Sequence, residues 1–272
     1  MTATDTDDFT RDWQTWHEAR EAALREPHGW LSLTAFHWLD SEPAALEGLP
    51  GLWRSADGVA IVAAAAADGL TVDGPAVGGP DGPAPIDGTA TFDPAEGAGP
   101  QWVGFGDKKI EIALRGGRHA VRVRDPKAPT RAAFTGVPTF APDSAWVRTG
   151  RFTAYADPEA VIVGAARPDL KHTLHAVGAV RFDLDGRQQE LLATAAGDGR
   201  LGLLFRDATN GDSTEAWRQL NTEPPGPDGT VTLDFNRSVN LPCTFTDYGT
   251  CPLPPGPNTI GAAVTAGERA LG

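Results

Sequence analysis

The chain has little cysteine, methionine, tyrosine or lysine. Among its 272 residues are two cysteines, one methionine and two tyrosines, and only four of the 23 basic residues are lysines. A chain of this length can bury a substantial core and does not need disulfides to fold. We therefore expect Cys243 and Cys251 to be free thiols by default, with a disulfide across their seven intervening residues as the alternative.

Basic charge and long apolar runs are also scarce. The net charge is -13, which argues against a nucleic-acid backbone or an anionic membrane as a partner. No apolar run approaches the roughly 18 residues of a membrane span, and the first residues lack the basic and apolar regions of a signal peptide. These features predict a cytoplasmic, soluble protein, and they do not specify an oligomeric state.

Several standard catalytic motifs are missing. The sequence has no G-x-S-x-G elbow, no Walker loop and no G-x-G-x-x-G after a strand, so acyl hydrolases, NTPases and dinucleotide enzymes lose their usual signatures. Of the six histidines only His172 and His175 are close in sequence, and on a strand they would point to opposite faces. The two cysteines lack the partners of a zinc site. We predict no metal and no cofactor.

The N-terminal part has a helical pattern. Residues 8–25 show apolar side chains at helical spacing, and Pro27 ends the pattern. A short helical segment is expected at 31–39, as an apolar lid in which His28 and His37 either pack or bind a ligand. Residues 1–48 are therefore predicted to form a helical cap.

From residue 49 onward the pattern becomes one of short strands separated by glycine, proline and aspartate. Strands are predicted at 59–64, 69–72 and 89–92, with a glycine- and proline-rich loop at 73–88. Strand patterns continue to the C-terminal region. The expected fold is mainly β, an antiparallel β-sandwich or barrel with an N-terminal helical cap, in which residues 49–272 form one structural unit with the cap.

Residues 108–125 predict a hairpin that turns at Gly116-Gly117. Its register pairs Ile112 with Val121 and Ile110 with Val123 on one face. On the other face Glu111 lies opposite Arg122, and Arg124 belongs to the same row of arginines. Such a row is either a solvated sheet surface or an anion-binding wall, because guanidinium groups match carboxylate and phosphate.

The stretch from Val231 to Glu268 concentrates polar and proline residues. A strand with alternating apolar residues is predicted from Val231, with Asp234 and Asn236 on its polar face. Arg237 and Asn240 follow directly, before a loop stiffened by prolines. Such a strand end either lines a pocket or completes the domain by hydrogen bonding.

The same stretch resembles the family called domain of unknown function 1684, found in bacteria and archaea. The resemblance rests on D-F-N-R at 234–237, Asn240, Pro242-Cys243, C-P-L-P-P at 251–255, Asn258 and A-G-E at 266–268. Shorter pieces at 29–39, 122–125 and 207–211 are also similar. The chain departs from the family pattern at Glu215, Val239, Leu241 and Thr259. The resemblance implies a shared fold and no particular activity.

Two functions follow from the residues that remain. In the first, the protein is an enzyme that acts on a small anionic molecule by acid–base chemistry without a redox cofactor. In the second, it is a non-catalytic small-ligand-binding or structural protein, and the polar residues only tie loops to the sheet. The first assigns catalysis to Asp207, Asp234 and Arg237, and ligand binding to Arg122, Arg124, Asn236 and Asn240.

Overall fold

The computed structural model describes residues 3–73 and 83–271, so most of the loop predicted at 73–88 lies outside the described residues. The chain divides into two compact units. Unit 1 comprises residues 1–22, 135–244 and 249–272; unit 2 comprises residues 23–134 and 245–248. These boundaries differ from the division at residue 48 that the sequence predicts.

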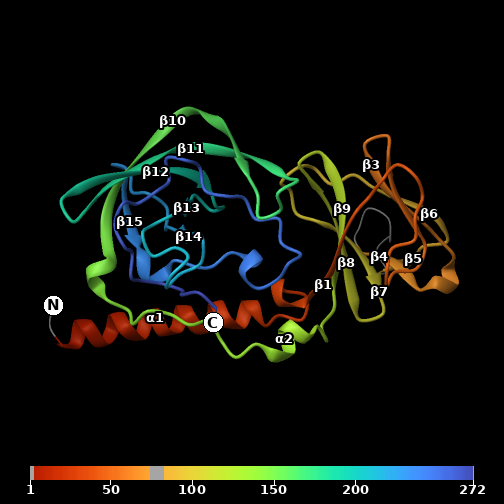
Figure 1. The fold of residues 1–272 in the computed structure, drawn as a ribbon, viewed down its shortest axis with the longest axis horizontal. Helices are drawn as coiled ribbons and strands as arrows, with labels where there is room; N and C mark the ends of the chain where they lie inside the picture. Colours follow the sequence, from red (N-terminus) through yellow and green to blue (C-terminus); the bar gives the residue numbers. More distant parts are fainter. Residues whose placement is uncertain (1–2, 74–82, 272) are drawn as a thin grey trace. The chain divides into compact units, whose positions relative to one another are not determined.

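The described residues form fifteen strands, two α-helices and several short 3₁₀ turns (Figure 1). The helices are α1 (Ala3–Leu24) and α2 (Pro129–Ala133). The strands are β1 (Leu33–Trp38), β2 (Leu52–Ala56), β3 (Val59–Ala64), β4 (Leu70–Asp73), β5 (Ala84–Pro85), β6 (Gly88–Phe92), β7 (Gln101–Phe105), β8 (Lys108–Arg115), β9 (Arg118–Arg124), β10 (Val147–Gly164), β11 (Lys171–Leu184), β12 (Arg187–Ala195), β13 (Leu201–Phe205), β14 (Arg218–Asn221) and β15 (Thr230–Asp234). The prediction of a mainly β, antiparallel fold with an N-terminal helix is confirmed.

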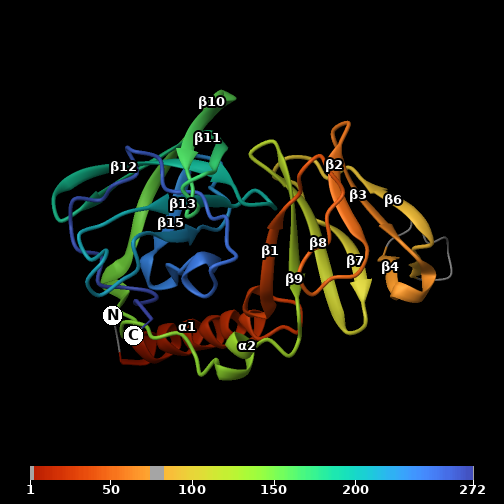
Figure 2. The ribbon, with the colours of Figure 1, turned by 45° about the vertical axis from the view of Figure 1, so that its right-hand side comes forward.

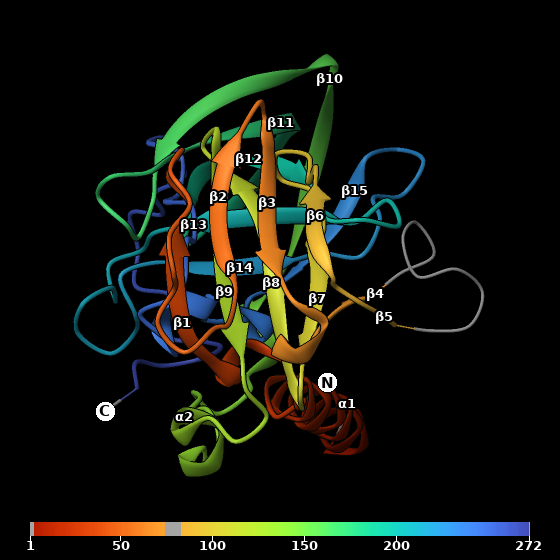
Figure 3. The same cartoon turned by 90° about the vertical axis from the view of Figure 1, so that its right-hand side faces the viewer.

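Unit 2 contains two antiparallel sheets. One has the order β1-β9-β8-β7-β4-β5 (Figure 2), and β2, β3 and β6 run side by side in the other (Figure 3). Trp53 and Val62 from the smaller sheet belong to the same buried cluster as Ile110 and Val121 from the larger one. The two sheets therefore share one hydrophobic core, as in a sandwich.

The predicted hairpin of unit 2 is confirmed in detail. Strands β8 and β9 pair Ile112 with Val121 and Glu111 with Arg122. Gly116 and Gly117 turn the chain with φ of 59° and 74°, a region that favours glycine. The isoleucine and valine face is fully buried, as the alternation predicts.

The helical segment predicted at residues 31–39 is wrong. Only Trp30–Ser32 forms a 3₁₀ turn, and Leu33–Trp38 is strand β1 at the edge of the larger sheet. Strand β1 pairs with β9, about 85 residues further along the chain, and its backbone hydrogen bonds depend on that partner. Partners so distant in sequence override a weak local preference.

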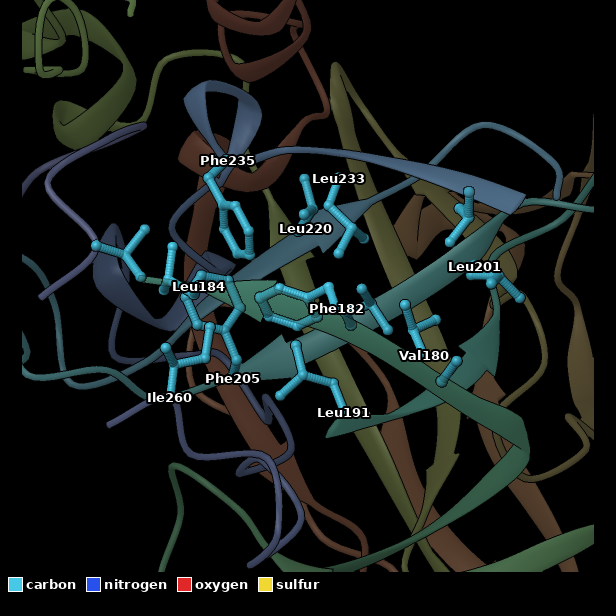
Figure 4. Close-up of a cluster of buried hydrophobic side chains, with 14 of the residues drawn as sticks. Val180, Phe182, Leu184, Leu191, Leu201, Phe205, Leu220, Leu233, Phe235 and Ile260 are labelled. Atoms are coloured by element: carbon cyan, nitrogen blue, oxygen red, sulfur yellow. The ribbon is translucent and has the colours of Figure 1, made fainter. Parts of the chain in front are cut away.

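Unit 1 contains one antiparallel sheet with the order β14-β13-β12-β11-β10-β15. The strand patterns that continue to the C-terminal region include the long β10, which runs beside β11 (Figure 1). The rings of Phe182, Phe205 and Phe235 lie together in the core of this unit (Figure 4), with centroids 5.6 and 5.8 Å from that of Phe235.

Helix α1 contacts other segments of unit 1 through polar groups. The indole Nε1 of Trp13 donates a hydrogen bond to the carbonyl oxygen of Asn236 at 2.9 Å. Glu21 accepts a hydrogen bond from the backbone of Val137 at 2.9 Å. The predicted helix is confirmed, although it begins at Ala3, earlier than expected. No helix in the described part of the chain is long and apolar enough to cross a membrane.

Candidate functional site

The predicted catalytic residue Asp207 lies in a buried network of unit 1. Its Oδ2 accepts a hydrogen bond from Nη2 of Arg218 at 2.8 Å, and both side chains are fully buried. Its Oδ1 accepts bonds from the backbone N–H groups of Thr209 (2.8 Å) and Val264 (3.2 Å). Arg218 also donates to the carbonyl oxygens of Val264 and Ala266. This carboxylate holds the end of β13 to the C-terminal segment and is closed to a ligand.

Burial lowers the pKa of Arg218, because water no longer solvates its charge. The neighbouring Asp207 carboxylate opposes that shift. The pair is thus a buried charge pair, which costs much stability when one partner is removed.

Asp234, Asn236 and Arg237 are brought together, but Asp234 and Asn236 do not share the polar face of one strand as predicted. Strand β15 ends at Asp234, and Phe235–Arg237 is a 3₁₀ turn. The Asp234 carboxylate caps this turn by accepting from the backbone N–H and Nδ2 of Asn236, at 3.1 and 2.8 Å. The end of a strand leaves backbone N–H groups without partners, and the Asp234 side chain accepts a hydrogen bond from one of them. Asp234 therefore favours the turn over a longer strand.

Arg237 is the most exposed of the predicted catalytic residues. Its Nε donates to Asp234 at 3.1 Å, and its Nη2 pairs with Asp12 on α1. Its side chain keeps 29 % of its accessible surface. Asn236, in contrast, is buried and bonds the backbone of Asp143 with both ends of its amide, each at 2.9 Å.

Asn240 belongs to a network around the buried carboxylate of Glu268. Its backbone N–H donates to Glu268 at 2.6 Å, and its Nδ2 donates to the carbonyl oxygen of Arg269 at 2.8 Å. Arg20 of α1 pairs with the same carboxylate at 2.9 Å. Arg218 donates to the Glu268 carbonyl at 3.3 Å and thereby joins this network to that of Asp207. The network ties the helix and the chain end to the sheet.

The predicted ligand-binding residues Arg122 and Arg124 lie in unit 2, where both pair with Glu111. Arg122 approaches one carboxylate oxygen at 2.8 Å, and Arg124 approaches the other at 2.7 Å. Arg124 also donates to the carbonyl oxygens of His28 and Gly29. All three charged side chains are buried. The row of arginines is therefore neither a solvated surface nor an open anion-binding wall.

Unit 2 has a cavity of about 440 Å³ whose lining is largely polar. Its wall includes Thr34, Phe36, His37, Glu47, Lys108 and Tyr248. The residues come from β1, the start of β8, the connection after β1 and the short segment 245–248 that belongs to this unit. None of them is among the predicted catalytic and ligand-binding residues, and of the two lid histidines that the sequence left open as ligand-binding, His37 lines the cavity.

A bulge in β1 shapes this wall. Leu33 pairs with Arg124 and Ala35 pairs with Val123, which leaves Thr34 as an extra residue in β1. A bulge bends the strand and changes where the following side chains point, and bulges are frequent beside functional sites. The run from Thr34 to His37 lines the cavity as a result.

His37 and Lys108 are the two side chains of this cavity best able to take part in binding or proton transfer. Nε2 of His37 is buried and has no hydrogen-bond partner among the residues that the structure describes. The Lys108 ammonium lies 3.3 Å from Asp125 and keeps 32 % of its side-chain surface. The sequence leaves open whether His37 packs in an apolar lid or binds a ligand, because the fold that opens the cavity beside it is non-local.

The two cysteines lie next to each other in unit 1 as free thiols. The backbone N–H of Cys243 donates to Sγ of Cys251 at 3.2 Å. Hydrogen bonding to Cys251 and burial raise the pKa of the Cys243 thiol above its usual range. A thiol in this state is a poor nucleophile. Within the described ranges, no group of three or more histidine, cysteine and acidic side chains could hold a metal.

The C-terminal half of the chain, residues 132–269, matches the family described as protein of unknown function DUF1684. The chain belongs to this family. The similar pieces at 29–39 and 122–125 lie outside the matched residues.

A solved structure is also similar: the solution NMR structure of an uncharacterized protein of Haloarcula marismortui. It is 34 % identical and covers 51 % of this chain and 78 % of its own, with a TM-score of 0.43. No curated protein matches the chain. The residues that match the family include all of β10 to β15. Of the described residues that line the cavity of unit 2, only Tyr248 lies within the matched range.

Proposed function

We propose that the cavity of unit 2 binds a small anionic molecule and that the protein transforms it by acid–base chemistry. The observation that carries this proposal is that His37 lines a polar cavity and that its buried Nε2 has no hydrogen-bond partner among the described residues. A buried nitrogen without a partner costs about 1–3 kcal/mol. A ligand that bonds this atom recovers that cost, so the cavity favours an occupant with a polar group there.

Charge supports an anion as the occupant. Lys108 is the only lysine or arginine among the described residues that line the cavity, and its ammonium remains partly open to water, whereas the one lining carboxylate, Glu47, lies in the connection after β1. Arg122 and Arg124 do not compete for the ligand, because Glu111 already pairs with both. A carboxylate or phosphate on Lys108 would leave the rest of a small molecule against Phe36 and His37.

His37 is suited to move a proton because an imidazole ring can both accept and donate one. Tyr248 and Thr34 supply hydroxyl groups that can orient the ligand. Asp207 is a buried carboxylate and Asp234 caps a turn, so neither is assigned a catalytic role here. This proposal assigns the proton transfer to His37 instead.

Binding is tested by calorimetric titration with phosphate, succinate and malate. Lys108→Gln should weaken the binding of the best of these anions about tenfold or more, which corresponds to about 1.4 kcal/mol. Lys171→Gln is the matched control, because it removes the same charge from an exposed position on β11 of unit 1. Equal affinities for the two variants would contradict the site.

Catalysis is tested separately by hydrogen–deuterium exchange at the carbon next to the carboxylate of the bound acid. His37→Gln should abolish exchange and change the affinity only a few fold, whereas His175→Gln, at an exposed position of unit 1, should change neither. Tight binding without exchange in the wild-type protein would favour the second candidate, a non-catalytic binder. The observation that favours a non-catalytic binder is that Asp207 and Asp234 are both held in ion pairs with arginines.

A further inference from the structure

A second cavity lies entirely within unit 1 and within the residues that match the family. Its volume is about 260 Å³, and Ala165, Ala166, Trp217, Leu253, Cys243 and Glu215 are among the residues that line it. The wall is mainly apolar, with a protonated thiol, one indole and one carboxylate. It differs in chemistry from the cavity of unit 2, which has a lysine.

Backbone hydrogen bonds hold the walls of this cavity in place. The N–H of Leu253 donates to the carbonyl oxygen of Gly164 at 2.9 Å, and that of Ala166 donates to Cys251 at 2.8 Å. A side chain at Gly164 would meet Leu253 at 3.1 Å, so the two segments are closely packed. A cavity with such walls is preformed and does not need a ligand to order it.

Trp217 offers a hydrogen bond that no described residue takes. Its Nε1 is buried and has no partner in the part of the chain that the structure describes. An indole N–H can only donate, so it requires an acceptor atom. A ligand oxygen in the cavity would satisfy it.

Glu215 sets the charge of the ligand. One of its carboxylate oxygens accepts a hydrogen bond from the backbone of Leu271 at 3.1 Å, and its second oxygen can accept from a ligand. A carboxylate in a small apolar cavity disfavours an anionic occupant. The thiol of Cys243 carries no compensating positive charge.

We propose that this cavity binds an uncharged ligand with an amide group on a small apolar body. The amide carbonyl accepts from Nε1 of Trp217, and the amide N–H donates to Glu215. The alanines and Leu253 contact the apolar part. An amide carries its acceptor oxygen and its donor N–H on two separate atoms, so one uncharged group can serve both side chains at once.

The probe is benzamide, and its binding is followed through the indole N–H signals of the protein in ¹⁵N spectra. Eight tryptophans give eight indole signals, and Trp217→Phe identifies the relevant one by its loss. Benzamide should shift the Trp217 signal with saturation, and benzoate, which has the same ring but a negative charge, should bind at least tenfold more weakly. This comparison uses the wild-type protein and does not depend on the folding of a variant.

Two variants assign the recognition to the two side chains. Trp217→Phe should weaken benzamide binding about tenfold, measured by ligand-observed NMR. Glu215→Gln keeps the acceptor for Leu271 and should remove most of the preference for benzamide over benzoate. His37→Gln, in the other cavity, should leave benzamide binding unchanged, so failure of the proposed function and failure of this site are distinguishable.

Three results would overturn the proposal: no saturable shift of the Trp217 indole at the solubility limit of benzamide, a shift confined to other indoles, or equal binding of benzoate.

Discussion

Arg218 of unit 1 and Lys108 of unit 2 are both cations beside one aspartate, but they differ in their access to water. The Arg218–Asp207 pair is fully buried and is surrounded by backbone hydrogen bonds. The Lys108–Asp125 pair keeps 32 % and 18 % of its side-chain surface and lies beside a cavity. The first pair is committed to the fold, whereas the proposed function assigns Lys108 of the second pair to a ligand. Access to water, rather than residue type, separates the two roles.

The largest expected effect tests the buried side of this comparison. Arg218→Met leaves the Asp207 carboxylate buried without its partner, which should cost about 3–5 kcal/mol of unfolding free energy. Differential scanning calorimetry measures the loss. Lys108→Met is the matched control and should cost no more than about 1 kcal/mol, because its ion pair is partly exposed. Similar melting of both variants would show that burial does not separate the two pairs.

An intermediate effect is expected at Arg237, whose side chain lies between these extremes with 29 % of its surface accessible. Arg237→Ala removes its hydrogen bond to Asp234 and should cost about 1–2 kcal/mol, because Asp234 keeps its bonds to Asn236. Denaturant unfolding measures this loss. Arg181→Ala, which breaks an exposed ion pair on β11, should change stability by less than about 0.5 kcal/mol.

Loss of anion binding in Arg237→Ala with unchanged stability would restore the predicted catalytic role of this residue.

The smallest expected effect concerns the pH dependence of stability and compares two histidines of unit 2, His37 and His119. The Nε2 atom of each has no hydrogen-bond partner among the described residues. His37 lines the cavity, whereas His119 is buried and its Nδ1 bonds Ser55 at 2.8 Å. Burial lowers the pKa of His119 below its usual 6.5. The unfolded chain therefore binds a proton first as the pH falls, so the contribution of His119 to stability is complete above pH 6.5 and decreases below it.

The slope from one such histidine is at most about 1.4 kcal/mol per pH unit. His119→Gln should flatten the dependence of unfolding free energy on pH below about 6.5, measured by urea titrations. His37→Gln serves as the comparison at the cavity. An unchanged pH dependence in His119→Gln would mean that its protonation does not differ between the folded and unfolded states.

The local parts of the fold could be predicted closely. The register of β8 and β9 follows from alternation and a two-glycine turn, because both strands and the turn lie within 17 consecutive residues. Strand β1 could not be predicted in the same way. Its partner β9 is far along the chain, and the bulge at Thr34 appears only in the pairing of the two.

The candidate site was less accessible to prediction than the fold. Asp207, Arg122 and Arg124 have the residue types of an active site, but the structure encloses each of them with an opposite charge. Tyr248 and His37 come from segments more than 200 residues apart, and no local spacing indicates that they line one cavity. The residue types indicate which reactive groups the chain contains, but they do not indicate which of these groups are accessible to a ligand.

The sequence by itself determined the mainly β class, the N-terminal helix, the hairpin register and the family, because these depend on short-range periodicity and local motifs. Tertiary structure alone decided which charges are buried in pairs, where β15 gives way to the capped turn at Asp234, and which side chains surround the two cavities. The physical reason is desolvation: the cost of burying a charge depends on every group around it, and those groups come from distant parts of the chain.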